Sequence, residues 1–377
     1  MSTTKRGLLV LEDGSVFAGR SMGAEGECVG PIVFYTGVTG YQEVLSDPAY
    51  AGQMVLFTFP HIGNVGVTAE DDESARPQVR AVLARQISAT PSNWRAERPL
   101  PDWLKEHGVP ALSGLDTRRL TLLLRDKGTL RGALSTVDPD PDRLLVLARA
   151  DAPAAAGANP SAPHPWTEGV PPAWDPDISM ARPRHTAAGG PPPHVVVVDL
   201  GVKRQLLRHL VRLGARVTVA PSHSTADEIL ALAPDGVIVA GGADDRAQAP
   251  GPVDAIRGLL GRLPILGMGA GHLAVGVALG ARVLRMRGGH HGVNHPVQGA
   301  DGTLAITAHA HARALDADSL AGLPVEVTAV SLFDGSVEAL RHREWPVWGV
   351  QYQPEASPGP HDGLGALGEF VAALAAR

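Results

Sequence analysis

Short apolar runs alternate with amphipathic segments throughout the C-terminal half of the chain. Val195–Val198 is an apolar strand, and the leucines of 203–213 recur at helical spacing. The pattern predicts further strands at 217–220, 236–240 and 264–268, and helices at 226–232 and 271–279. Such alternation is typical of an α/β fold with a parallel sheet covered on both faces. Ligands bind such sheets at the strand carboxyl ends, so we expect the chemistry at the turns after Ala240 and Met268.

The N-terminal half has a different pattern. Apolar runs at 8–11 and 15–18 flank Asp13-Gly14 and predict a hairpin. Further strands are expected at 32–35 and 55–59, and leucine spacing predicts a helix at 118–125. We therefore expect a smaller mixed α+β domain at 1–150, to which the pattern alone assigns no activity.

A segment rich in small residues separates the two halves. Between residues 151 and 193, 25 of 43 residues are Ala, Pro or Gly, a composition typical of a connector. The alternative is a loop that packs on the domains, and Trp166 and Trp174 favour it for part of the segment. The predicted domains are thus 1–150 and 194–377, joined by 151–193.

Composition narrows the function classes. Hydrophobic residues make up 44% of the chain, enough for two cores. A net charge of −6 and 4% aromatic residues disfavour a nucleic-acid partner. The apolar run 7–11 is too short for a secretory signal, and no apolar run is long enough to span a membrane. Cys28 is the single cysteine of the sequence, so that an intrachain disulfide is impossible. We expect a soluble cytoplasmic protein without membrane contact.

Several motifs follow one another in an order that identifies a family. Gly267–His272 reads Gly-Met-Gly-Ala-Gly-His, and Gln351–Glu355 reads Gln-Tyr-Gln-Pro-Glu. The first resembles the Gly-x-Cys-x-Gly-x nucleophile elbow of class I glutamine amidotransferases, and the second resembles their His-x-Glu segment. Within that class the chain resembles the small subunit of carbamoyl phosphate synthetase, through segments 39–43, 60–66, 115–118, 289–296, 331–335 and 354–362.

The resemblance implies a fold, an activity and a partner. Small subunits of this family hydrolyse glutamine and pass ammonia through a tunnel to a large ATP-using synthetase subunit, in pyrimidine or arginine biosynthesis. A cysteine attacks the carboxamide, a histidine activates the cysteine and a glutamate orients the histidine. The resemblance implies no cofactor for the small subunit, and its expected partner is the large subunit.

The sequence departs from the family at the reactive positions. Gly269 stands at the nucleophile position and Gln353 at the base position, so that only Glu355 of the triad remains. Glycine has no thiol, and an amide does not take up a proton near neutral pH. We therefore predict that glutamine hydrolysis is absent, and that Gly269 serves as a turn glycine.

Positions that bind substrate in the family have also changed. The family loop Asn-Gly-Pro-Gly-Asp reads Ala240–Asp244 here, and the stretch Gln-Asn-His-Gly-Phe reads His309–Arg313. An apolar side chain at position 273 offers no hydrogen bond to a polar substrate. The family substrate positions, most of them altered, are Ala49, Gly241, Ala243, Ala270, Leu273, Ala310, Ala312 and Arg313.

Two groups of residues admit a second interpretation. The histidines at 290, 291, 295, 309 and 311 suggest a metal site, but we interpret them as structural hydrogen-bonding side chains and predict no metal. Cys28 is interpreted as an inert apolar residue rather than a displaced nucleophile.

The sequence leaves three hypotheses for the function of the chain. The favoured hypothesis is a noncatalytic subunit that binds the large synthetase chain while ammonia comes from solution. The alternative is a pseudo-amidotransferase recruited to regulation or ligand binding in another pathway, with Leu273, His309, His311 and Arg313 shaping a different pocket. Least favoured is an active glutaminase, because the nucleophile is absent.

Overall fold

The computed structural model describes residues 5–150, 160–170 and 191–376. The chain divides into two compact units, each with its own core. The first comprises Met1–Gly157 and Arg287–Gly292, and the second comprises Ala158–Met286 and Val293–Arg377. The sequence pattern did not predict that 287–292 belongs with the N-terminal residues. Most of the predicted connector, 151–159 and 171–190, lies outside the described residues.

The first unit is built on a closed barrel, with strand order β1-β2-β8-β6-β4-β3-β9. Its strands are β1 (Arg6–Leu11), β2 (Val16–Ser21), β3 (Glu27–Tyr35), β4 (Met54–Phe57), β6 (Ala81–Ala84), β8 (Ala111–Ser113) and β9 (Arg131–Ser135), and β5 (His61–Ile62) pairs with β7 (Gln86–Ile87). Its helices are α1 (Tyr41–Ser46), η1 (Pro48–Tyr50), η2 (Ala69–Asp71), α2 (Leu100–Glu106), α3 (Thr117–Lys127) and α4 (Pro141–Arg149). The predicted mixed α+β character is confirmed, whereas closure of the barrel was not predicted.

Strand β1 shows why its sequence is apolar at consecutive positions. Leu9 and Leu11 belong to the core cluster of the barrel strands and α3, while Leu8 and Val10 pack against α4. Because successive side chains of a strand point to opposite faces, a strand buried on both faces needs an unbroken apolar run.

The second unit contains a ten-stranded mixed sheet, in the order β10-β12-β11-β13-β14-β19-β18-β17-β15-β16. The five strands from β12 to β19 are parallel, whereas β18, β17 and β15 continue the sheet antiparallel. The strands are β10 (His164–Trp166), β11 (His194–Asp199), β12 (Arg216–Pro221), β13 (Gly236–Ala240), β14 (Ile265–Met268), β15 (Val283–Gly299), β16 (Leu304–Leu315), β17 (Val325–Ser331), β18 (Val337–His342) and β19 (Val347–Val350).

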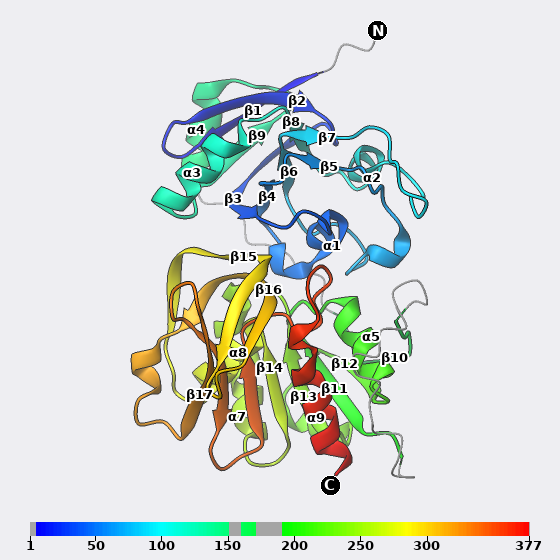
Figure 1. The fold of residues 1–377 in the computed structure, drawn as a ribbon, viewed down its shortest axis with the longest axis vertical. Helices are drawn as coiled ribbons and strands as arrows, with labels where there is room; N and C mark the ends of the chain where they lie inside the picture. Colours follow the sequence, from blue (N-terminus) through cyan, green and yellow to red (C-terminus); the bar gives the residue numbers. More distant parts are fainter. Residues whose placement is uncertain (1–4, 151–159, 171–190, 377) are drawn as a thin grey trace. The chain divides into compact units, whose positions relative to one another are not determined.

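Helices cover both faces of the parallel strands (Figure 1). The helices are α5 (Arg204–Arg212), α6 (Ala226–Ala231), η4 (Asp244–Gln248), α7 (Pro250–Leu259), α8 (Ala270–Ala278), η5 (Ala317–Leu320), η6 (Asp362–Leu364) and α9 (Gly365–Ala375). On β11, Val195 and Val197 belong to the core formed with α5 and α9, while Val196 and Val198 belong to the core formed with α6, α7 and α8. The predicted α/β class, with a parallel sheet covered on both faces, is confirmed.

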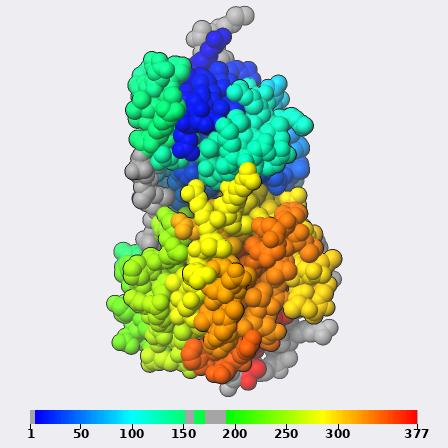
Figure 2. Space-filling model, turned by 90° about the vertical axis from the view of Figure 1, so that its left-hand side faces the viewer, coloured from blue at the N-terminus to red at the C-terminus, as the bar shows by residue number. Residues whose placement is uncertain are grey.

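The edges of the sheet extend beyond the predicted strands. Part of the predicted connector forms β10, which pairs antiparallel with β12, and Trp166 Nε1 donates to Glu168 O at 2.8 Å. Trp174 lies outside the described residues. The segment that carries β17 and β18 forms the orange surface in Figure 2. Among the residues that the structure describes, no helix combines the length and apolar character needed to cross a membrane.

Candidate functional site

The turn between β14 and α8 keeps the backbone of a nucleophile elbow. Gly269 has φ 57° and ψ −119°, and its N–H donates to Val350 O at 2.9 Å. A Cβ at Gly267 would lie 2.5 Å from Gly271 O, and one at Gly271 would lie 1.8 Å from Val239 O. A Cβ at Gly269 would meet nothing within 4 Å. The turn therefore has room for a side chain at 269, but carries no nucleophile there.

The segment after β19 carries the family's base position and is linked to this turn through Val350. Val350, which accepts from the elbow glycine, ends β19, and Gln353 follows three residues later. Gln353 N–H donates to Ala308 O of β16 at 2.9 Å, and the side chain is half-buried. A carboxamide in this place can exchange hydrogen bonds but cannot act as a general base.

Glu355, the remaining member of the triad positions, has an ammonium group nearby. Its side chain is buried, and Oε1 lies 3.7 Å from Nζ of Lys203, which is also buried. Lys203 Nζ additionally donates to Ala356 O. Because a buried carboxylate needs a compensating charge or hydrogen bonds, this contact contributes to the stability of the buried Glu355.

The loop after β13 lies against the turn that follows β11. Gly241 and Gly242 have φ of 78° and 80°, and Gly242 N–H donates to Gly201 O at 2.8 Å. A Cβ at Gly242 would lie 1.8 Å from Leu200 O, so the backbone approach itself requires glycine. Ala243 has φ −71°, which suits a residue with a Cβ. The change from the family's second loop glycine is thus compatible with the loop's conformation.

Asp244 connects this loop to β16. Its Oδ2 accepts from the backbone N–H of Ala312 at 2.5 Å. Burial raises the pKa of Asp244 to about 7, despite the lowering effects of this hydrogen bond and of Arg313. Arg313 Nη1 in turn donates to Gln248 Oε1 at 3.4 Å. Hydrogen bonds therefore join the segment 244–248 to strand β16.

The altered substrate positions occupy two kinds of environment. Ala270 and Leu273 lie in the core between α8 and the sheet, with exposed fractions of 1% and 0%. Ala310, Ala312 and Arg313 are half-buried on β16. Ala49 belongs to the first unit, where its N–H donates to Asp47 Oδ1 at 2.8 Å. The second unit thus brings together the elbow, the 351–355 segment, the 241–244 loop and β16.

Neither of two other reactive side chains takes the place of a missing group. His272, within the elbow motif, is fully buried, and burial lowers its pKa to about 3. A neutral imidazole with so low a pKa is a poor base. Cys28 lies on β3 of the barrel, and burial raises the pKa of its thiol to about 12, which suits an inert residue.

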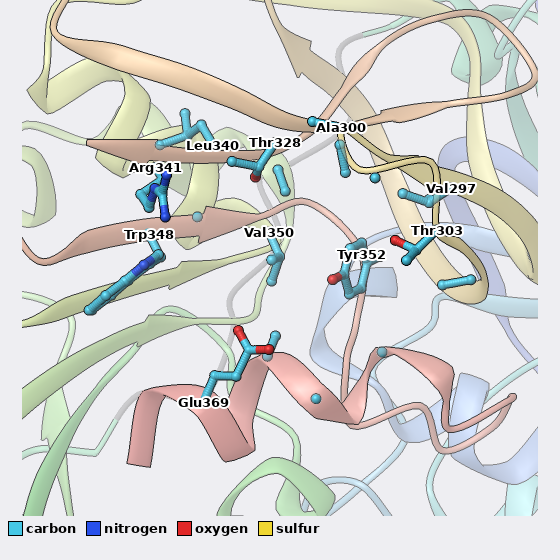
Figure 3. A pocket seen from close by; sticks show the side chains of 18 of the residues that line it. Val297, Ala300, Thr303, Thr328, Leu340, Arg341, Trp348, Val350, Tyr352 and Glu369 are labelled. Atoms are coloured by element: carbon cyan, nitrogen blue, oxygen red, sulfur yellow. The ribbon is translucent and has the colours of Figure 1, made fainter. Parts of the chain in front are cut away.

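A separate cavity of about 650 Å³ lies between α9 and the strands β15 to β19. Glu369 of α9 and Tyr352, which follows β19, line it, and Figure 3 shows Glu369 extending from the helix toward Val350. None of the altered substrate positions lines this cavity. Sequence reasoning missed it, because β15 to β18 and α9 were not among the predicted elements.

Family models match both halves of the chain. The model for the carbamoyl-phosphate synthase small chain, CPSase domain, matches residues 9–134, and that for glutamine amidotransferase class-I matches residues 196–370.

Curated relatives match the chain over nearly its whole length. The carbamoyl phosphate synthase small chain of Thermosynechococcus vestitus is 47% identical over 98% of this chain and 96% of its own length. The proteins of the same name from a Synechococcus strain and from Listeria monocytogenes are 44% and 41% identical, each over 98% of this chain and 94% and 96% of their own lengths. Identity at this level and over this span shows the family, and the chain belongs to the carbamoyl phosphate synthase small chains.

Proposed function

We propose that this chain is a noncatalytic small subunit, which binds the large ATP-using subunit of a carbamoyl phosphate synthase and does not hydrolyse glutamine. Gly269 carries this proposal. The elbow backbone is kept, yet the residue at its apex has no side chain that could attack a carboxamide.

The surroundings of the elbow support the loss of chemistry. Gln353 cannot accept the proton that a nucleophile must release. Leu273 is packed in the core and offers no polar atom to a substrate amide. Because triad residues act as a unit, loss of the nucleophile alone removes most of the rate acceleration.

Binding to a large chain is supported by the span of the similarity. The relatives are named small chains, and this protein matches them from the barrel unit to the end of the sheet unit. Both cores are fully formed. A chain that has lost its reactive groups but keeps both units is suited to a scaffolding role, in which the large chain draws ammonia from solution.

Reconstitution tests this proposal. The full chain is mixed with the large synthase chain of the same genome, and complex formation is measured by size-exclusion chromatography. We expect a stable complex that makes carbamoyl phosphate from ammonium but not from glutamine. The matched control is Gly368→Ala, which changes a residue within α9 and should give the same two rates as wild type.

Two results would contradict the proposal. Release of ammonia from glutamine by the purified chain or by the complex would show that hydrolysis persists. Failure of the chain to bind the large subunit would remove the scaffolding role.

A further inference from the structure

Three side chains of a type that binds transition metals converge in the second unit. His309 and His311 are two residues apart on β16 and therefore share one face of the strand. Glu338 lies on β18. Their exposed fractions are 2%, 3% and 0%.

The ligand atoms are close enough for a single ion. His309 Nδ1 lies 2.9 Å from His311 Nε2 and 3.8 Å from Glu338 Oε2, and one ligand atom from each of the three side chains lies within 4.8 Å of those of the other two. Zinc bonds of about 2.0–2.2 Å in a tetrahedron separate ligand atoms by roughly 3.3–3.6 Å. The two separations of 2.9 and 3.8 Å each differ from that range by a few tenths of an ångström.

The neighbouring hydrogen bonds determine where the ring protons lie. His311 Nδ1 is 2.9 Å from Arg313 O, and a carbonyl only accepts, so Nδ1 carries the hydrogen. Thr307 Oγ1 donates its only hydrogen to His295 O at 2.9 Å. His309 Nε2, 2.7 Å from the same hydroxyl, must therefore donate to it.

These assignments direct two lone pairs at each other. In neutral rings, His309 Nδ1 and His311 Nε2 are then both acceptors, 2.9 Å apart, with the Glu338 carboxylate beside them. A positive charge held between these atoms would stabilise the arrangement. The occupant is either an additional proton or a metal cation.

We propose that His309 Nδ1, His311 Nε2 and Glu338 Oε2 bind a divalent transition-metal ion of the Zn²⁺ type. Two imidazoles and one carboxylate are a known zinc ligand set, with a fourth position left for another ligand. The outer nitrogens donate to a hydroxyl and a backbone carbonyl, which is how proteins orient metal-binding histidines. The ion neutralises Glu338 and relieves the repulsion between the facing lone pairs.

The proposal departs from the sequence-based interpretation of these histidines as structural, and it does not depend on the proposed binding of a large chain. Ala310 and Ala312 alternate with the two histidines on β16, and the carbonyl of Ala308 holds the segment that contains Gln353. The metal would therefore stiffen the strand that carries the altered substrate positions.

Metal titration of the full-length wild-type chain tests the proposal without any substitution. After treatment with a chelator and dialysis, the apoprotein is titrated with Co²⁺ and then with Zn²⁺ in competition with a chromophoric chelator. We expect one ion per chain and visible Co²⁺ bands typical of four-coordinate nitrogen and oxygen ligands. Saturating Zn²⁺ should displace the Co²⁺.

Variants locate the site. His309→Gln and Glu338→Gln should each weaken Zn²⁺ binding by at least about 100-fold, and Thr307→Val, which removes the hydroxyl that orients His309, by about 10–100-fold. The matched control is His223→Gln, because His223 is exposed and should leave affinity unchanged. Circular dichroism establishes that each variant is folded.

Three outcomes would overturn the proposal. One is wild-type protein that binds no ion at one equivalent. Another is a folded His309→Gln variant with unchanged affinity. The third is a ¹⁵N NMR spectrum in which both nitrogens of His309 stay protonated at saturating Zn²⁺, which would identify a proton as the occupant.

Discussion

Replacement of Gly269 by alanine should destabilise the second unit although the added methyl group has ample space. The new Cβ would meet no atom within 4 Å. The backbone, with φ 57° and ψ −119°, lies in a region that residues with a Cβ rarely adopt. Conformational strain and not collision therefore determines the effect.

The size of the expected change in Tm follows from that strain. A residue held in such a region costs about 1–3 kcal/mol. For a unit of roughly 150–250 residues, 1 kcal/mol lowers Tm by about 2–4 °C. We expect Gly269→Ala to lower the Tm of the second unit's transition by about 2–12 °C in differential scanning calorimetry.

Gly368→Ala is the matched control in the same unit. Gly368 lies within α9, and its added Cβ also meets nothing within 4 Å, but the backbone there is helical. Alanine in a helix is favoured over glycine by about 0.5–1 kcal/mol, so this Tm should rise. An unchanged or raised Tm in Gly269→Ala would refute the argument that glycine relieves strain at the elbow.

Three further predictions concern the same region. Gly269→Cys with Gln353→His should not restore ammonia release from glutamine, because the altered substrate positions remain; measurable turnover would contradict this. Lys203→Met should lower the free energy of unfolding, measured in urea, by about 3–5 kcal/mol, because the buried Glu355 carboxylate loses the nearby ammonium group. The double variant with Glu355→Gln should recover most of that loss. Burial raises the pKa of Asp244 from 3.8 to about 7, so the unfolded state loses this proton first and stability falls as pH rises from about 4 to 7. Asp244→Asn should flatten that slope and raise stability at pH 8, and an unchanged slope in urea titrations would contradict the assignment.

Local patterns predicted the elements of the sheet unit better than its edges. Val195–Val198 is buried on both faces, and its unbroken apolar run signals a central strand by itself. β15 mixes exposed, half-buried and buried positions, and it contains glycine and histidine in place of a regular apolar alternation. Such a strand is defined by its pairing with distant partners, which local periodicity does not reveal.

The same distinction holds for the candidate site. The elbow was predictable because one of its glycines is required by a close backbone approach within a few residues, that of Gly267 to Gly271. The contact between Lys203 and Glu355 joins residues about 150 positions apart, and nothing in either local sequence indicates it. The grouping of Glu338 with the histidines of β16 was equally hidden, since it depends on how β16 and β18 are placed.

The persistence of the elbow geometry without a nucleophile has a physical basis. A reactive residue with a side chain at such a turn has a strained backbone conformation, which persists because the reaction requires that geometry. Under the proposed loss of the reaction, glycine is the substitution that removes the strain and leaves the turn unchanged. The hydrogen bond from Gly269 to Val350 then still joins β14 to β19, and the carbonyl of Ala308 still fixes the segment that contains Gln353. The proposed loss of catalysis at position 269 would therefore leave these backbone contacts of the second unit unchanged.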